Sequence, residues 1–416
     1  MPVTPVTTRP GRGSAFGAVR RDNLAVLLRL LHVNGPLSRS ELVVRTGLSR
    51  STIGGMVADL AGRGLVLEAP PARSGQPGRP SPVVQVRPDG PAVLAVDVGV
   101  DAIGVAVIGL GDRVRAHERA GRRRDRYAPD RTADDIGELT DRVLATLSEP
   151  PRLVAVGVAV PGLVRAADGF VALAPNLGWR EAPVGSLVGE RLGLGVPVRV
   201  ANEADLGGLA ESIRGAGAGC RNVVYVSGEV GVGGGIICEG VPLRGFAGYG
   251  GEVGHVPVNP AGSPCRCGAT GCWETEVGEE ALLRRAGRND DEDRAGTIDA
   301  LLQAADGGDP RALESLDEHG RWVGIGLSIL VNVFNPERIV LGGLFARVYP
   351  YIADRIGWEL DRRALQATLA GAQVLPAALG ADSALIGAAE LAWQETLDDP
   401  TAIPTVPGRE STGEAG

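Results

Sequence analysis

Cysteine and histidine residues concentrated in one glycine-rich segment restrict the fold of this chain more than any other feature. Three of the five cysteines and one of the four histidines fall there, at His255, Cys265, Cys267 and Cys272. Three thiolates and an imidazole complete a tetrahedral Zn2+ shell with no open position, which is typical of a structural metal site. Gly268 and Gly271 allow the tight loop that brings such ligands together. Small buried cysteines are the alternative, and the close spacing beside a histidine favours zinc.

The composition is that of a soluble globular protein with two or three domains. The chain has 416 residues, of which 44% are hydrophobic and 22% charged. No apolar run approaches the ~20 residues that span a bilayer, and no secretory signal is apparent, so we expect no membrane contact. Cys220 and Cys238 stand apart from the cluster and indicate no disulfide framework, which favours a reduced, cytoplasmic location. All 42 basic residues are arginine, and the lack of lysine excludes a Walker-type phosphate loop.

Residues 1–90 are basic, whereas the rest of the chain is acidic. They contain twelve arginines and five acidic residues, a net charge of +7, against −8 for the whole chain. Such asymmetry points to a polyanionic partner for this segment alone. A solvated basic face is the alternative, and charge by itself does not exclude it.

The same segment has the sequence pattern of a winged helix-turn-helix. Residues 19–33 carry leucines at helical spacing and predict a first helix. Ser38 caps a second helix that runs to Arg45, and Glu41 completes a capping box. The remaining predicted elements are a turn at 46–48, a third helix after Ser49, and strands at 65–68 and 83–86. We therefore predict a disordered start at 1–17 and a winged helix-turn-helix over 18–88.

In this arrangement the third helix enters the major groove of double-stranded DNA, and the wing reaches the minor groove. The residues predicted to contact DNA are Ser49, Arg50, Ser51, Thr52, Arg73 and Arg79. Two such domains in an oligomer would read a palindromic operator. A helical linker domain with a flexible proline-rich tether is the alternative for this segment.

From residue 92 onward the sequence alternates apolar strands with glycine loops. Strand pairs at 93–99 with 104–108 and at 222–226 with 234–238, together with strands at 153–160 and 338–341, suggest two duplicated α/β lobes around a cleft. We predict a first lobe over 91–200 with about 381–396, a second lobe over 201–380 that carries the zinc site, and a disordered tail over 398–416.

Several motifs together resemble one family. They are Asp97-x-Gly99, Asn202-Glu203-Ala204-Asp205, the glycine run at 228–235, and Gly-Glu-x-x-Gly-His followed by Cys-x-Cys-Gly-x-x-Gly-Cys. With the winged front end, they make residues 18–396 similar to the ROK family of repressors, open reading frames and sugar kinases. The resemblance implies an actin-like, two-lobed sugar-kinase (ribonuclease H-like) fold with a sugar in its cleft, preceded by a DNA-binding domain in the regulatory branch.

A carboxylate can accept hydrogen bonds from two neighbouring hydroxyls at once, so carboxylates with amides beside them are well suited to bind a sugar. The resemblance implies sugar contacts from Asn202, Glu203, Glu252, His255 and Glu274, with Asn176 as an additional candidate. A solvated acid at Glu274 and a helix-capping Asn202 are the alternatives. We expect His255 to bind zinc through one ring nitrogen and to face the sugar with the other.

The resemblance also places a nucleotide site, which here looks degenerate. Its residues are Asp97, Gly99, Asp101, Glu229, Gly231, Gly233, Gly342 and Gly343. Asp101 stands where the family has the threonine of Asp-x-Gly-Gly-Thr, and Glu229 stands at the first glycine of Gly-Thr-Gly-x-Gly-Gly-Gly. Like charges beside ATP phosphates cost roughly several kcal/mol. Glu203 replaces the aspartate at the kinase base position.

These observations predict a sugar-responsive DNA-binding transcriptional regulator of carbohydrate uptake or catabolism genes, with repression the expected mode, and not an enzyme. An active sugar kinase with an accessory DNA-binding domain and a zinc-stapled scaffold without ligand are the alternatives. The effector is a monosaccharide, an amino sugar or a small oligosaccharide. The sequence leaves open which sugar binds, whether it releases or recruits DNA, and whether the protein is a homodimer or a homotetramer.

Overall fold

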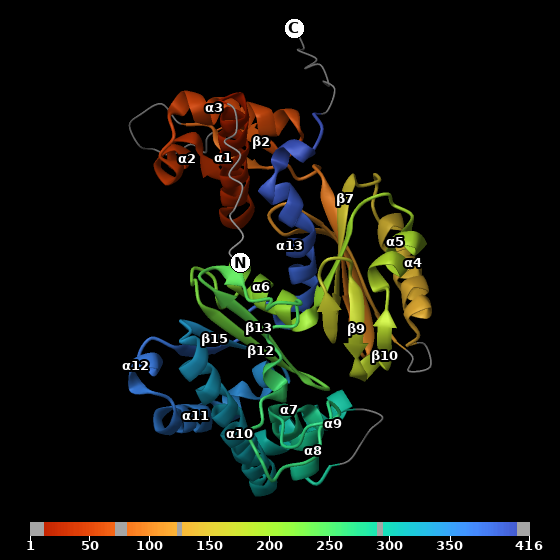
Figure 1. Cartoon of the computed structure of the whole chain (residues 1–416), viewed down its shortest axis with the longest axis vertical. Helices are drawn as coiled ribbons and strands as arrows, with labels where there is room; N and C mark the ends of the chain where they lie inside the picture. The colour runs from red at the N-terminus through yellow and green to blue at the C-terminus, as the bar shows by residue number, and fades with distance from the viewer. Residues whose placement is uncertain (1–11, 71–80, 123–126, 289–293, 406–416) are drawn as a thin grey trace, which may run out of the picture.

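A computed structural model describes residues 12–70, 81–122, 127–288 and 294–405. It consists of an N-terminal head at one end of the molecule and two α/β lobes beyond it (Figure 1). The predicted wing contacts Arg73 and Arg79 lie outside the described residues. None of the helices within those ranges is both long and apolar enough to cross a membrane.

The head is the predicted winged helix-turn-helix. Its elements are α1 (Arg12–Asn34), β1 (Leu37–Ser38), α2 (Arg39–Thr46), α3 (Arg50–Gly62), β2 (Val66–Ala69) and β3 (Val83–Val86), with strand order β1-β3-β2. The predicted capping box is confirmed, because the Glu41 N–H donates to Ser38 Oγ (3.2 Å) and the Ser38 N–H donates to the Glu41 carboxylate (2.7 Å). Because α1 begins at Arg12, the predicted disordered segment 1–17 extends too far.

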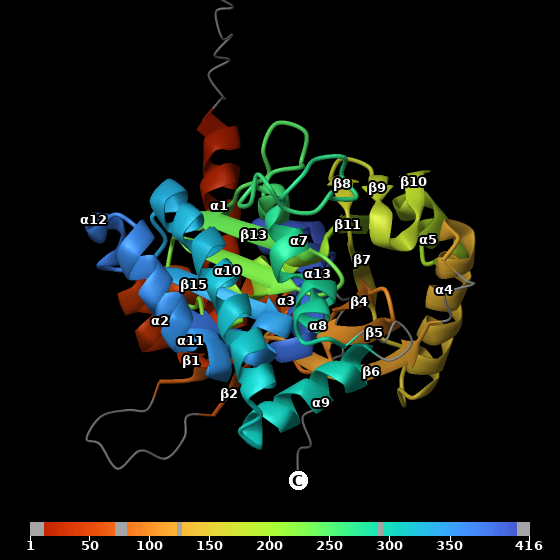
Figure 2. The same cartoon turned by 90° about the horizontal axis from the view of Figure 1, so that it is seen from below.

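The first lobe is a five-stranded sheet with order β11-β7-β4-β5-β6. Its strands are β4 (Ala92–Val98), β5 (Ala102–Gly109), β6 (Arg113–Gly121), β7 (Leu153–Val160) and β11 (Val198–Asn202). Helices α4 (Pro129–Ala145) and α5 (Val184–Leu192) cover one face, and α13 (Ser383–Asp398) covers the other (Figure 2). A Cβ at Gly157 would lie 1.9 Å from the Ala388 carbonyl oxygen, so only glycine admits α13 at this distance. A small sheet follows β7, formed by β8 (Leu163–Arg165), β9 (Phe170–Ala174) and β10 (Trp179–Ala182), with η2 (Pro175–Leu177).

The second lobe repeats this topology, with order β14-β13-β12-β15-β16. Its strands are β12 (Val223–Gly228), β13 (Val232–Cys238), β14 (Val241–Pro242), β15 (Arg338–Gly343) and β16 (Gln373–Pro376). In each lobe, three antiparallel strands precede two parallel ones. The helical elements are α6 (Glu203–Arg214), η3 (Val253–His255), α7 (Trp273–Val277), α8 (Glu279–Arg285), α9 (Arg294–Asp306), α10 (Pro310–Phe334), α11 (Leu344–Arg363), α12 (Gln366–Leu369) and η4 (Gly380–Asp382). The predicted pair of lobes is therefore confirmed.

The head shares a hydrophobic core with α13 and the face of the first-lobe sheet that α13 covers. Leu24 and Leu28 of α1 belong to the same buried cluster as Trp393 of α13 and Ile403, which follows η5 (Pro400–Ala402). Arg63 of the head donates hydrogen bonds to the carbonyl oxygens of residues 401 (2.8 Å) and 403 (2.6 Å). The prediction of a disordered tail is therefore wrong for residues 398–405, because this segment packs against the head and is hydrogen-bonded to it. Residues 406–416 lie outside the described residues.

His319 of α10 is fully buried, and neither ring nitrogen has a hydrogen-bond partner within the described residues. Burial, with a smaller contribution from Arg285, lowers its pKa to about 3. We expect His319→Leu to raise the free energy of unfolding by about 1 kcal/mol at pH 7, because an unsatisfied buried polar group is removed. Below pH 6.5, His319 binds a proton in the unfolded wild-type chain but stays neutral in the folded protein. Wild-type stability should therefore fall by up to about 1.4 kcal/mol per pH unit relative to the variant.

Urea unfolding of both proteins at pH 7 and pH 5 measures this difference. His117→Gln is the control, because it removes a histidine from an exposed position and leaves the buried ring of His319 in place. Equal losses in the wild type and in His319→Leu between the two pH values would contradict the assignment.

Candidate functional site

The four predicted metal ligands converge in the second lobe. Their ligand atoms all lie within 4.8 Å of one another. His255 Nδ1 is 3.7 Å from Cys265 Sγ, and Cys267 Sγ is 3.6 Å from Cys272 Sγ. Zinc–sulfur bonds of about 2.3 Å at tetrahedral angles place two sulfurs about 3.8 Å apart, so these separations fit a tetrahedral ion.

The backbone around the cluster is built for this convergence. Gly271 has φ 71°, and a Cβ there would lie 1.6 Å from the Asn259 carbonyl oxygen. Isolated β-bridges join Pro257 to Cys272 and Pro264 to Thr270, which folds the loop back on itself. Without a cation, burial raises the pKa of Cys272 to about 12. A divalent cation is what would hold all three thiols as thiolates, so the donor set is that of a structural zinc site.

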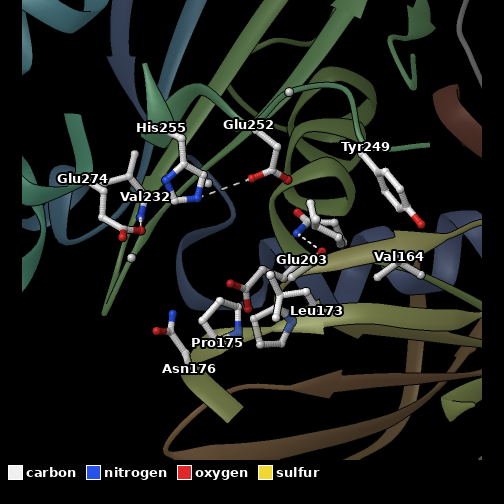
Figure 3. A pocket seen from close by; sticks show the side chains of 18 of the residues that line it. Val164, Leu173, Pro175, Asn176, Glu203, Val232, Tyr249, Glu252, His255 and Glu274 are labelled. Atoms are coloured by element: carbon white, nitrogen blue, oxygen red, sulfur yellow. Dashed lines mark hydrogen bonds and ion pairs between the residues drawn. The ribbon is translucent and has the colours of Figure 1, made fainter. Parts of the chain in front are cut away.

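A cavity of about 350 Å³, here called the polar cavity, lies between the lobes beside this cluster. All six residues predicted to contact a sugar line it, namely Asn176, Asn202, Glu203, Glu252, His255 and Glu274. Figure 3 shows Glu252, His255 and Glu274 on one side and Asn176 on the opposite side, with Glu203 between them. The set combines side chains from the small sheet of the first lobe, from α6, and from the metal-binding segment of the second lobe.

The metal cluster positions two of these side chains directly. His255 directs Nδ1 toward Cys265, and its Nε2 lies 3.8 Å from Glu252 Oε2 inside the polar cavity. Glu274 lies two residues after Cys272 in the sequence. The Oε2 atom of Glu274 accepts a hydrogen bond from the Val232 N–H (3.1 Å). Burial raises the pKa of Glu252, while His255 opposes the shift. A metal held by the loop would therefore fix the orientation of His255 and Glu274 in the polar cavity.

Asn202 has a structural role as well as a place in the polar cavity. Its Oδ1 accepts hydrogen bonds from the N–H groups of Ala204 (2.8 Å) and Asp205 (3.2 Å), which caps α6. Its Nδ2 donates to the Gly162 carbonyl oxygen (2.9 Å). The capping alternative from the sequence is thus observed. An amide has two N–H donors, so one remains for a ligand.

Sequence reasoning missed three other side chains of the polar cavity, which are Asp205, Tyr249 and Arg266. Burial raises the pKa of Asp205 to about 7, and Glu252 adds to the shift. Arg266 donates to Asn176 Oδ1 (3.4 Å). The signal for Asp205 was present, because it lies within the same Asn-Glu-Ala-Asp motif as two predicted residues. Tyr249 and Arg266 lie in irregular loops, where spacing gives no orientation.

A second cavity of about 370 Å³, here called the acidic cavity, adjoins the first at Glu203 and Glu229, which line both. Of the predicted nucleotide-site residues, Asp97, Gly99, Asp101, Glu229 and Gly343 line it. Gly231 and Gly233 line the polar cavity instead. Gly342 lines neither cavity and packs against Tyr225, whose hydroxyl oxygen would lie 2.1 Å from a Cβ there.

Carboxylates dominate the acidic cavity. Burial raises the pKa of Asp97 to about 6, although Arg119 lies 3.4 Å away and opposes the shift. Removal from bulk water and then the charge of Asp97 raise the pKa of Glu229 to about 7. Burial, and then the charges of Glu229 and Asp97, raise the pKa of Glu203 well above its usual range. Burial and mutual repulsion already disfavour negative charge on these carboxyl groups, so the cavity also disfavours the negative charge of a triphosphate.

In the head, the first turn of α3 faces solvent. Ser49 caps the helix, accepting from the Thr52 N–H (3.2 Å), and its Oγ lies 2.9 Å from Ser51 Oγ. All four described DNA-contact candidates, Ser49, Arg50, Ser51 and Thr52, are exposed. The predicted DNA-contact residues at the start of α3 are therefore accessible in this structure.

The fold and its cavities define a two-lobed, sugar-kinase-like protein that carries a winged helix-turn-helix head. The sequence profile of the ROK family matches residues 93–395. The xylose repressor of Bacillus subtilis is 29% identical over 91% of this chain and 97% of its own length. A crystal structure of a ROK family transcriptional regulator, a homologue of the E. coli Mlc protein, superposes with a TM-score of 0.75 at 25% identity, covering 92% of this chain and 97% of that one. A ROK glucokinase from Streptomyces griseus, solved with glucose and AMPPNP, has a TM-score of 0.60 at 32% identity, covering 73% of this chain and 99% of the kinase.

The chain belongs to the ROK family, in its transcriptional-regulator branch. The repressor and the regulator match it over nearly its full length, including the head, whereas the glucokinase covers only part of it.

Proposed function

We propose that this protein is a sugar-responsive transcriptional regulator that represses carbohydrate uptake or catabolism genes and does not phosphorylate its ligand. One observation carries the proposal. A single chain presents an exposed turn at the start of α3 and a polar cavity that is lined in part by His255 and Cys267 of the four-residue cluster suited to zinc. The zinc-type site has four protein ligands, so its role would be to hold geometry, with no position left for chemistry on a substrate.

The charge of the polar cavity favours a neutral, hydroxyl-rich effector. Among the described residues, five carboxylates line it, at Glu203, Asp205, Glu229, Glu252 and Glu274, against one arginine, Arg266. Carboxylates accept hydrogen bonds from sugar hydroxyls and repel phosphate groups. The name of the xylose repressor and the glucose bound in the glucokinase structure make D-xylose and D-glucose the first sugars to test.

The DNA-binding step needs two heads. Ser49, Arg50, Ser51 and Thr52 offer one arginine and three hydroxyls at the start of α3, a set that suits base edges and phosphates in the major groove. A homo-oligomer with paired heads would read a palindromic operator with half-sites about 10 base pairs apart, or a multiple of that.

A mobility-shift titration tests the proposal. Duplexes that bind the intact protein are first selected from a random library, and binding is then repeated with D-xylose, D-glucose or N-acetylglucosamine. We expect at least one sugar to change DNA affinity by about 5-fold or more, the usual range of allosteric coupling. Arg50→Ala should weaken DNA binding while leaving sugar affinity unchanged. Sugar binding without any change in DNA affinity would remove the sensor function.

The similarity to a glucokinase makes an active kinase the second candidate. We expect no release of ADP above background with the same sugars, because Asp101 and Glu229, the two acidic departures from the family's motifs, both line the acidic cavity. A coupled ADP assay that detects sugar-dependent turnover would establish the kinase instead.

A further inference from the structure

Three polar side chains meet in a buried contact where the head touches both lobes. His32 of α1, Arg214 of α6 and Glu390 of α13 have exposed side-chain fractions of 1%, 11% and 5%. Arg214 Nε donates to Glu390 Oε1 (2.6 Å), and His32 Nε2 lies 3.0 Å from Glu390 Oε2. The Gly111 N–H, in the turn between β5 and β6, donates to His32 Nδ1 (2.9 Å). Arg214 Nη2 also lies 2.7 Å from His32 Nε2, so each of the three side chains contacts the other two. We call these three side chains the coupling cluster.

Each member of the coupling cluster comes from a different helix, α1, α6 or α13. Helix α6 leaves the end of β11 in the first lobe and packs on β12 and β13 of the second. Helix α13 follows β16 of the second lobe and packs on β4 and β7 of the first. The two helices therefore cross between the lobes in opposite directions, and α13 lies beside α1 (Figure 1).

The crossing helices pack closely enough to transmit movement. A Cβ at Gly387 of α13 would lie 2.0 Å from the Leu206 carbonyl oxygen of α6. Near the C-terminal end of α6, the fully buried Glu211 accepts hydrogen bonds from the N–H groups of Ala378 (3.2 Å) and Leu379 (2.8 Å) and from Ser383 Oγ (3.1 Å). Glu211 thereby ties α6 to the segment that leads into α13 and acts as a pivot between the two.

The other end of α6 lies in the polar cavity. Asn202 caps the helix, and Glu203, its first residue, lines the cavity. The twelve residues of α6 span about 18 Å. One rigid helix thus has its N-terminus at the proposed effector and its C-terminal Arg214 against α1 of the head.

We propose that the coupling cluster is the contact through which closure of the lobes on a sugar changes the placement of the DNA-binding head. This inference rests on the proposed function. A shift of α6 against α13 would disturb the contact of Arg214 with Glu390, to which His32 is also bound, because the three side chains belong to three different helices. Sugar and DNA affinities are then linked through this contact.

The test is a thermodynamic cycle on the full-length chain, with the DNA duplex affinity measured in the presence and absence of D-xylose and of D-glucose. Arg214→Gln removes the ion pair from α6. His32→Phe removes both ring hydrogen bonds from α1 while keeping an aromatic ring near Trp393, whose centroid is 6.5 Å away. We expect the sugar-dependent change in DNA affinity to fall below about 2-fold in both variants, with sugar affinity within about 3-fold of the wild type. Arg214→Lys should restore part of the coupling.

Arg142→Gln, which breaks a 2.8 Å ion pair to Glu118 inside the first lobe, is the matched control and should keep wild-type coupling. Thermal unfolding identifies a variant that fails to fold, and the other variant then decides the outcome. Wild-type coupling in either folded variant would overturn the inference and leave the proposed function standing. A wild-type protein that binds sugar without changing its DNA affinity would overturn both.

Discussion

Cys265→Ser is expected to lower the free energy of unfolding by about 3 kcal/mol and to weaken sugar binding by at least about 10-fold. The stability estimate divides the ~10–16 kcal/mol that zinc contributes in small zinc domains among four ligands. Sugar binding should fall with it, because the loop that carries Cys265 also sets the ring of His255 and the position of Glu274 in the polar cavity. Removal of zinc with a chelator should have the same two effects on the wild-type protein.

Urea unfolding, metal analysis and calorimetric titration with D-xylose and D-glucose measure the outcome. Cys238→Ser is the matched control, since this free cysteine lies in β13 outside the cluster. A folded, zinc-free Cys265→Ser protein with wild-type sugar affinity would show that the metal has no part in shaping the polar cavity.

Glu252→Ala is expected to weaken sugar binding by about 100-fold with little change in stability. Hydrogen bonds to a charged group are each worth about 1.5–3 kcal/mol, and a carboxylate can accept from two hydroxyls at once. Glu252 is not one of the four predicted metal ligands, and it lies 3.8 Å from His255 Nε2. A loss of affinity in Glu252→Ala would therefore report the contact between Glu252 and the sugar. Glu252→Gln, which keeps the shape and loses the charge, should give an intermediate loss.

Titration calorimetry with the sugar that binds the wild type most tightly provides the measurement. Glu190→Ala, at an exposed position of α5, is the control and should bind as the wild type does. Unchanged affinity in Glu252→Ala would exclude Glu252 from the sugar contacts and would place the effector elsewhere in the polar cavity.

Local signals in the sequence were sufficient to predict the elements of the head and the metal cluster. The Ser38 and Glu41 capping box depends on residues three apart, and it forms as expected. The three cysteines also lie close in sequence, so a single loop brings them together with His255. Both features depend on neighbouring residues more than on the packing of distant elements.

Features that depend on distant packing were missed. The segment from 398 to 405 has the composition of a disordered tail, yet Ile403 is buried because the head supplies its partners. Gly231 and Gly233 belong to a glycine run typical of phosphate binding, but the β12–β13 hairpin turns them toward the polar cavity. His32 and Glu390 are separated by 358 positions in the sequence, and no periodicity relates them.

The core that the head shares with α13 and the C-terminal segment also affects how the protein can be divided for experiments. Leu24 and Leu28 are buried together with Trp393 and Ile403. A fragment that begins at the first lobe would therefore expose a hydrophobic surface along α13. Such a fragment should aggregate, and an isolated head would lose its packing against Trp393 and Ile403. Recombinant work on either activity therefore requires the undivided polypeptide.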